Sequence, residues 1–121
     1  MDRLEQLLSA PAPPPLAQAA RDTGCPPEGI RALESAGRLI RVEADLAWAT
    51  ASYQELAARA LAMARRGPLS PAAFRDATGT SRRYVLAILE DLDRRGILLR
   101  SPDGHRPGPR APAPPAAAAP P

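Results

Sequence analysis

The chain has 121 residues and a formal net charge of +3, and its 16 basic residues are all arginine. This length allows one ordinary domain or two very small ones. A single cysteine, Cys25, excludes an intramolecular disulfide, and no apolar run is long enough to span a membrane, so we expect a cytoplasmic protein. Residues 1–52 hold five arginines and seven acids, whereas residues 53–121 hold eleven and six, so a polyanion would dock on the second half.

The first half predicts three short helices and two strands. Leu4, Leu7 and Leu8 have helical spacing, and the proline run at 10–15 ends that helix. A second helix runs from Leu16 to Asp22. The third helix begins near Pro26 and closes at Gly37, and strands follow at 39–42 and 46–48.

The second half predicts the same order of elements. Ser52 and Glu55 have the spacing of a capping box, which predicts a helix that starts there and ends at Gly67-Pro68. Ser70 caps a short helix, and Thr80 or Ser81 caps the next one, which ends at Gly96. A strand over 97–100 and a short return strand at 105–106 complete the series.

The helix that ends at Gly96 organises the second half. Val85, Ile88, Leu89 and Leu92 form its buried stripe, because they recur at i, i+3, i+4 and i+7. The opposite face, predicted to be wet, carries Arg83, Ala87, Glu90 and Arg94. A helix that opens with exposed arginines and packs by its other face is typical of a groove-reading helix, and the alternative is a solvated helix.

The two halves repeat each other, and the offset grows from 55 residues at Thr23-Gly24 to 59 residues at Gly37. The second copy therefore has about one extra helical turn in its third helix. The order of elements predicts a mainly α protein with small β-wings, built from two tandem winged helix-turn-helix units over 1–52 and 53–108. Residues 109–121 are Pro/Ala-rich without periodicity, which predicts a disordered tail.

The candidate RNA- or DNA-binding residues lie at two places in the second unit. Arg82, Arg83 and Tyr84 begin the long helix, where guanidinium groups suit phosphates and Tyr84 either stacks on a base or packs half-buried. Arg100, His105 and Arg106 lie on the wing. His105 has no second His or Cys at ligand spacing, so we predict no metal site and no cofactor. The sequence also lacks a catalytic constellation, which argues against an enzyme.

The run FRDATGTSRRYVLAILEDLDRRGILLR, from Phe74 to Arg100, resembles the last winged helix of SelB, the bacterial selenocysteine-specific elongation factors. The resemblance covers roughly residues 4–106. The positions that match the family pattern are Phe74-Arg75-Asp76, Gly79, Ser81-Arg82-Arg83-Tyr84, Leu89-Glu90, Asp93, Gly96 and Arg100. The sequence departs from the pattern at Pro107, which predicts a weakened wing hairpin.

The resemblance implies that the final winged helix binds a hairpin in a selenoprotein mRNA, just after the UGA codon, as a monomer. Carried over to this sequence, the implied helix contacts are Ser81, Arg82, Arg83 and Tyr84. The implied wing contacts are Arg100, His105 and Arg106. The family's GTPase and tRNA-carrying domains lie upstream, so we expect this chain to be a C-terminal piece that reaches the ribosome only through them and does not hydrolyse GTP.

Two alternatives remain open from the residues alone. One is a winged-helix regulator that binds DNA, which would commonly dimerise to match two half-sites. The other is a winged helix that binds a protein and shows no salt-dependent affinity for nucleic acid.

Overall fold

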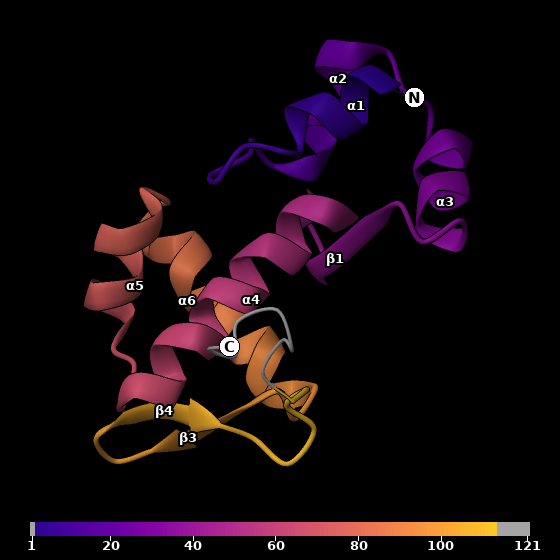
Figure 1. Ribbon diagram of the computed structural model, residues 1–121. Helices are drawn as coiled ribbons and strands as arrows, with labels where there is room; N and C mark the ends of the chain where they lie inside the picture. Colours follow the sequence, from indigo (N-terminus) through magenta and orange to yellow (C-terminus); the bar gives the residue numbers. More distant parts are fainter. Residues whose placement is uncertain (1, 114–121) are drawn as a thin grey trace, which may run out of the picture.

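The computed structural model describes residues 2–113, in which three helices and a two-stranded hairpin occur twice in succession (Figure 1). This order confirms the predicted fold class of two tandem winged helix units. The elements of the first unit are α1 (Asp2–Leu7), α2 (Leu16–Thr23), α3 (Pro27–Ser35), β1 (Leu39–Glu43) and β2 (Leu46–Ala49). Those of the second are α4 (Thr50–Arg66), α5 (Pro71–Thr78), α6 (Arg82–Arg94), β3 (Leu98–Ser101) and β4 (Gly104–Pro107).

The short helices of the first unit are held by packing and by a cap from its own hairpin. Asp45, in the turn between β1 and β2, accepts hydrogen bonds at the start of α2, from the Leu16 amide to its carbonyl (2.9 Å) and from the Ala17 amide to its carboxylate (2.7 Å). Gly24 ends α2 with a φ of 69°, which a side chain would strain. The core of this unit consists of Leu4, Leu8, Leu16, Ala19, Leu33, Leu39, Ala47 and Ala49.

The start of α4 differs from the predicted capping box. The helix begins at Thr50, and its N-cap is Ala49, which offers no side-chain hydrogen bond. Because β2 runs directly into α4, Ser52 already lies inside the first turn, and its hydroxyl donates to the Ser9 carbonyl at 2.7 Å. The predicted unit ranges 1–52 and 53–108 stay a prediction, since α4 joins the two units without a linker.

The second unit has the caps and the longer helix that the sequence predicts. Ser70 caps α5 by accepting from the Ala73 amide, and Ser81 caps α6 by accepting from the Tyr84 amide. Helix α6 has 13 residues and α3 has 9, a difference of about one helical turn. This confirms the prediction made from the change in repeat offset.

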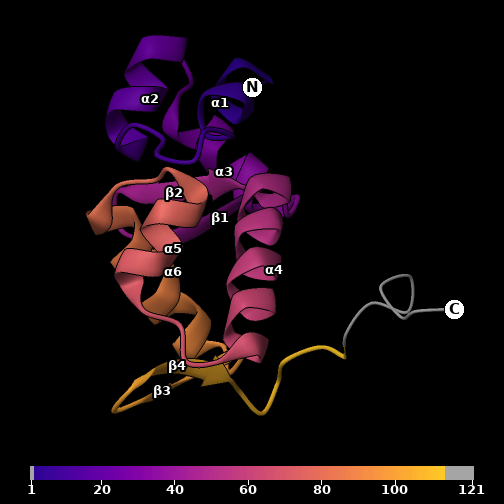
Figure 2. The same cartoon turned by 60° about the vertical axis from the view of Figure 1, so that its left-hand side comes forward.

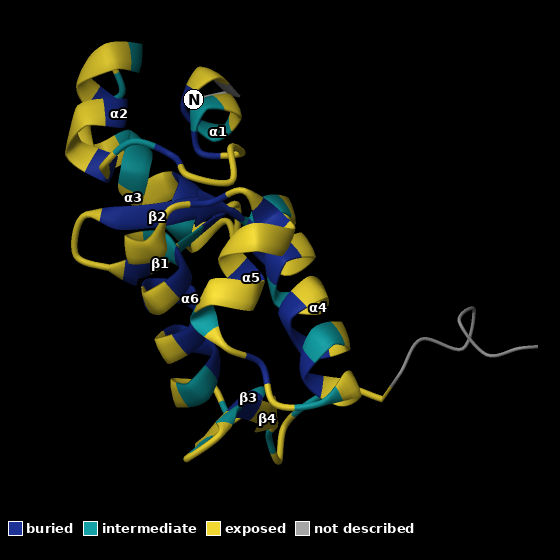
Figure 3. Ribbon diagram, turned by 90° about the vertical axis from the view of Figure 1, so that its left-hand side faces the viewer, coloured by how far each residue is buried: buried dark blue, intermediate teal, exposed yellow. Residues whose placement is uncertain are grey.

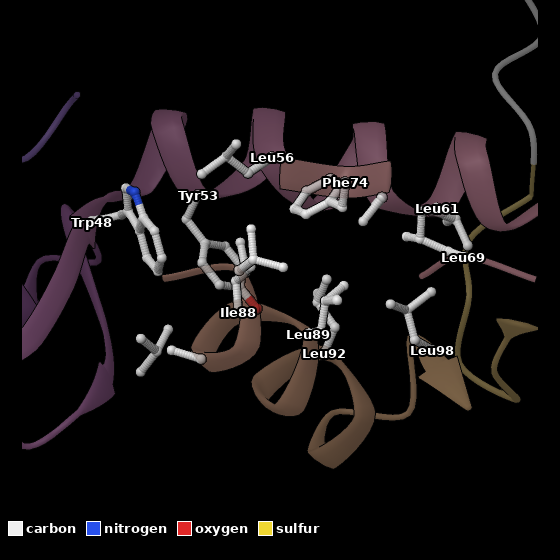
Figure 4. Close-up of a cluster of buried hydrophobic side chains, with 14 of the residues drawn as sticks. Trp48, Tyr53, Leu56, Leu61, Leu69, Phe74, Ile88, Leu89, Leu92 and Leu98 are labelled. Atoms are coloured by element: carbon white, nitrogen blue, oxygen red, sulfur yellow. The ribbon is translucent and has the colours of Figure 1, made fainter. Parts of the chain in front are cut away.

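The hairpin β1–β2 lies between the helices of the two units (Figure 2). Val42, Leu46 and Trp48 from this hairpin belong to the same buried cluster as the core of the second unit. Trp48 has no exposed surface, and its ring meets Tyr84 of α6 edge-on at 5.8 Å. Figure 4 shows Trp48 at one end of the row of core side chains that runs on to Leu98. The first hairpin is therefore a core element and is not free to act as a wing.

The position of this hairpin corrects one prediction about α6. Ala87, predicted on the wet face, is buried with only 3% of its surface exposed. It joins Val42 and Leu46 in the shared core, because β1 packs against this side of α6. Arg94, on the same side, donates to the Val42 carbonyl at 3.2 Å. The periodicity located the face correctly, but the first unit covers part of it.

A buried polar cluster also connects α4 with α6. The Tyr53 hydroxyl donates to the Asp91 carboxylate at 2.7 Å, and Arg95 and Arg94 donate to the same carboxylate at 2.8 and 3.0 Å. Burial, followed by the hydrogen bond to Asp91 and the charge of that carboxylate, raises the pKa of Tyr53 above its ordinary value. Thr80 adds a link between the units, since its hydroxyl donates to the Pro11 carbonyl at 2.6 Å.

The second hairpin forms in spite of Pro107, which was predicted to weaken it. Pro107 lies opposite Leu98 at the end of the ladder, and the amide of the next residue, Gly108, donates to the Ile97 carbonyl at 2.8 Å. Hydrogen-bonded and non-hydrogen-bonded pairs alternate in antiparallel strands, so Pro107 occupies a position where no ladder donor is required. On the outer side of β4, His105 pairs with Leu69 through two backbone hydrogen bonds of 2.9 Å.

The described part of the tail, residues 109–113, contains neither helix nor strand. Arg65 of α4 donates to the Pro112 carbonyl, and Ala111 packs against the core. The rest of the predicted disordered tail, residues 114–121, lies outside the described residues. Among the described helices, the structure has none with the length and apolar character needed to cross a membrane.

Candidate nucleic-acid interface

The residues predicted at the start of α6 do not share one role. Ser81 is the N-cap, and its hydroxyl accepts from the Tyr84 amide at 3.4 Å. Tyr84 is half-buried against Trp48, so of its two predicted roles the structure favours packing. Arg82 and Arg83 are both exposed. Only these two arginines of the four residues therefore present a free charged group at the surface.

Arg82 and Arg83 lie on different sides of α6. The Arg83 guanidinium forms an ion pair with Glu43 of β1 at 3.5 Å, on the side that the first unit covers. Arg82 lies on the other side, one residue and about 100° away. It lines a hollow of about 300 Å³ together with Ser70, Pro71, Ala72 and Arg75 of the α5 region. Two guanidinium groups thus line one open concavity.

The wing residues also divide into exposed and buried groups. Arg100 and Arg106 are exposed, and Arg106 pairs with Asp103 at 2.7 Å. Hydrogen bonds from the Ser101 hydroxyl and then from Arg106 hold the pKa of the Asp103 carboxyl below its usual range. His105 is buried, and its Nδ1 lies 3.1 Å from the Asp93 carboxylate of α6. The His105 side chain therefore attaches the wing to the helix and does not face solvent.

A second hollow, of about 400 Å³, lies between the wing and the start of α5. It is lined by Ser70, Pro71, Arg100, Ser101, Pro102, Asp103, Gly104 and His105. Ser70 and Pro71 line both hollows, so the two meet at the start of α5. Figure 3 shows exposed residues over the outer surface of α5, whereas β2 is buried along its length.

Sequence reasoning did not select Arg75 as a site residue. It lies on α5, directly after the buried Phe74, and faces solvent. The signal was the turn at Gly79, whose φ of 74° folds α5 back onto α6 and so brings an exposed arginine from each helix to one hollow. Among the described residues, no group of three His, Cys, Asp or Glu side chains could hold a metal ion.

Comparison with known proteins agrees with this arrangement. Residues 61–106 match a family model described as the winged helix of elongation factor SelB. The search of curated proteins gives no match. Among solved structures, the chain is similar to the mRNA-binding domain of elongation factor SelB from E. coli, a structure determined in complex with SECIS RNA.

The structural match has a TM-score of 0.74 at 23% sequence identity, and it covers 88% of this chain and 92% of the other. At that identity, the likeness establishes the shared fold of both winged helix units. The family model covers α6 and both hairpin strands of the second unit, including every predicted site residue. Residues 61–106 therefore belong to the winged-helix family of elongation factor SelB, as the sequence resemblance predicted.

Proposed function

We propose that this chain binds an mRNA hairpin through its second winged helix, as the C-terminal part of a selenocysteine-specific elongation factor. In this role it tethers the factor near an in-frame UGA codon. The chain contributes binding and no chemistry, and the hairpin is held by one monomer.

The observation that carries this proposal is the overlap of the SelB family match with the open arginine surface. The matched residues 61–106 include Arg75, Arg82 and Arg100, which line the two adjoining hollows of the second unit. Arginine forks suit phosphate oxygens and stack on exposed bases, and both groups are offered by an RNA hairpin. The solved neighbour named for mRNA binding has the same fold over nearly the whole chain.

The two alternative functions are less well supported. A DNA regulator of this class commonly uses two recognition helices on a two-fold axis, one for each half-site. In this chain the first unit has a recognition helix that starts at Pro27-Glu28, and its hairpin is buried. A protein-binding winged helix would not need the exposed arginines around the second unit's hollows.

The test is a titration of fluorescently labelled hairpins with the full chain at two salt concentrations. The hairpins are those encoded directly after in-frame UGA codons in the source genome, and duplex DNA serves as competitor. Replacing Arg82 and Arg83 with Ala should weaken binding by about 1–2 kcal/mol per arginine, as expected for charge-assisted hydrogen bonds. Each lost phosphate contact should also lower the salt slope by somewhat under one, about 0.7–0.9.

The matched control replaces Arg21 and Arg31, two exposed arginines of the first unit, and should bind like the wild type. The proposal is wrong if duplex DNA competes as well as the hairpin does. It is equally wrong if no hairpin binds with a measurable dependence on salt.

A further inference from the structure

We propose that the RNA backbone follows a track over the start of α5, held by Arg75, Arg82 and Arg100, and that it does not lie along the Arg83 side of α6. The inference rests on the proposed RNA binding and names its path. It adds Arg75 as a binding residue and moves the centre of the site from the middle of the recognition helix to the groove beside it.

One side of α6 is closed by the first unit. Ala87 is buried beneath the β1–β2 hairpin, Tyr84 packs on Trp48, and Arg94 is bound to the Val42 carbonyl. Arg83 lies at the edge of this side, where Glu43 is paired with it. Phosphates approaching along this side would meet the Glu43 carboxylate, which is 43% exposed, and would have to displace it from Arg83.

The other side of α6 is open. At 100° per residue, Leu86 follows Arg82 on this side, and it is one of the large apolar side chains that remain exposed, at 38%. The hollow between Arg75 and Arg82 is about 300 Å³, enough to admit a phosphate group with its ester oxygens, and it continues past Ser70 and Pro71 into the wing hollow.

The charges along this path favour an anion. Arg75, Arg82 and Arg100 are exposed guanidiniums. Two acids lie nearby: Asp76 lies 3.9 Å from Arg75, and Asp103 is already paired with Arg106 and bonded to Ser101. Planar guanidinium groups facing one groove can each bind a phosphate oxygen pair, so consecutive phosphates of one strand would bridge helix and wing.

The wing is fixed in place for this contact. His105 is bonded to Asp93 of α6 through its ring and to Leu69 through its backbone, so the wing position depends on the open side of the recognition helix and on the segment before α5. Arg100, which lies opposite His105 in the hairpin, is thereby held at a constant place relative to Arg82.

The experiment compares four single variants of the full chain, Arg75→Ala, Arg82→Ala, Arg83→Ala and Arg100→Ala, in the same labelled-hairpin titration at several salt concentrations. Circular dichroism checks that each variant keeps its helices. Arg66→Ala is the matched control, because Arg66 is an exposed arginine of the second unit that lines neither hollow.

We expect Arg75→Ala, Arg82→Ala and Arg100→Ala each to weaken binding about tenfold and to reduce the salt slope by about 0.7–0.9, the signature of one lost phosphate contact. Arg83→Ala should change the affinity less than twofold. The track is wrong if Arg75→Ala binds like the wild type while Arg83→Ala carries the loss. A wild-type chain that fails to prefer the hairpin over duplex DNA would instead overturn the proposed function itself, so the two failures are distinguishable.

Discussion

The two winged helix units have the same order of elements but use their hairpins in opposite ways. In the first unit the hairpin is buried, and every residue of β2 lies in the interior. In the second unit Leu99, Arg100 and Arg106 of the hairpin are exposed. The first unit thus supplies its wing to the core of the second, while the second keeps its own wing for contact with a partner.

This difference follows from a few side chains. The first hairpin carries Val42, Leu46 and Trp48, which fill the space beside α6. The equivalent strands of the second hairpin carry Arg100 and Arg106, which have nothing to bury. A repeated fold can therefore hold one supporting copy and one binding copy, and composition alone distinguishes them.

The largest effect should come from removing the buried ring that joins the units. Trp48→Ala should lower the free energy of unfolding by about 3–5 kcal/mol, because it leaves a cavity in a shared core. Urea denaturation followed by circular dichroism measures this. Leu99→Ala is the control, since Leu99 is 56% exposed on the free wing, and it should change stability by less than about 0.5 kcal/mol. Equal losses in the two variants would remove the distinction between the hairpins.

A smaller effect should appear at alkaline pH, through Tyr53. The raised pKa keeps this phenol protonated in the folded chain, whereas in the unfolded chain it ionises near pH 10. The stabilisation is therefore complete below pH 10 and is lost as the pH rises above it, by about 1 kcal/mol per pH unit at first. The chain has no lysine, which leaves few other groups to titrate in this range.

Tyr53→Phe isolates this contribution. Its free energy of unfolding should fall less steeply between pH 10 and pH 11.5 than that of the wild type, as measured by urea denaturation at each pH. Parallel pH profiles would show that the contact between Tyr53 and Asp91 does not hold α4 against α6 in the way described here.

The smallest effect should come from the exposed ion pair between the units. Glu43→Gln removes the partner of Arg83, and because both side chains are well exposed it should cost about 0.5 kcal/mol or less. Thermal unfolding of the two proteins, at low and at high salt, measures this. A loss comparable with that of Trp48→Ala would mean that charge and not core packing joins the units.

Much of the fold could be predicted from local patterns. The stripe Val85, Ile88, Leu89 and Leu92 is buried as predicted, Ser70 and Ser81 cap their helices, and the change in repeat offset anticipated the longer α6. These features depend on residues close together in the sequence. The capping box at Ser52 was wrong, because the true start of α4 is set by β2, which runs directly into it.

The site was harder to predict, because it depends on contacts between distant segments. Helical periodicity placed Ala87 and Arg83 on an outer face, but it could not reveal that β1, over 40 residues earlier, covers that face. In the same way, His105 was assigned to the wing by position, and its pairing with Asp93 and Leu69 turned it inward. Arg75 entered the site only once α5 was seen to fold against α6.

The central claim is that one unit binds RNA while the other supports it, and mapping amide chemical shifts by NMR during titration with the hairpin tests this most directly. The account predicts shifts over 70–83 and 100–106, with the amides of α2 and α3 unchanged. Shifts concentrated on α2 and α3, or spread equally over both units, would contradict it.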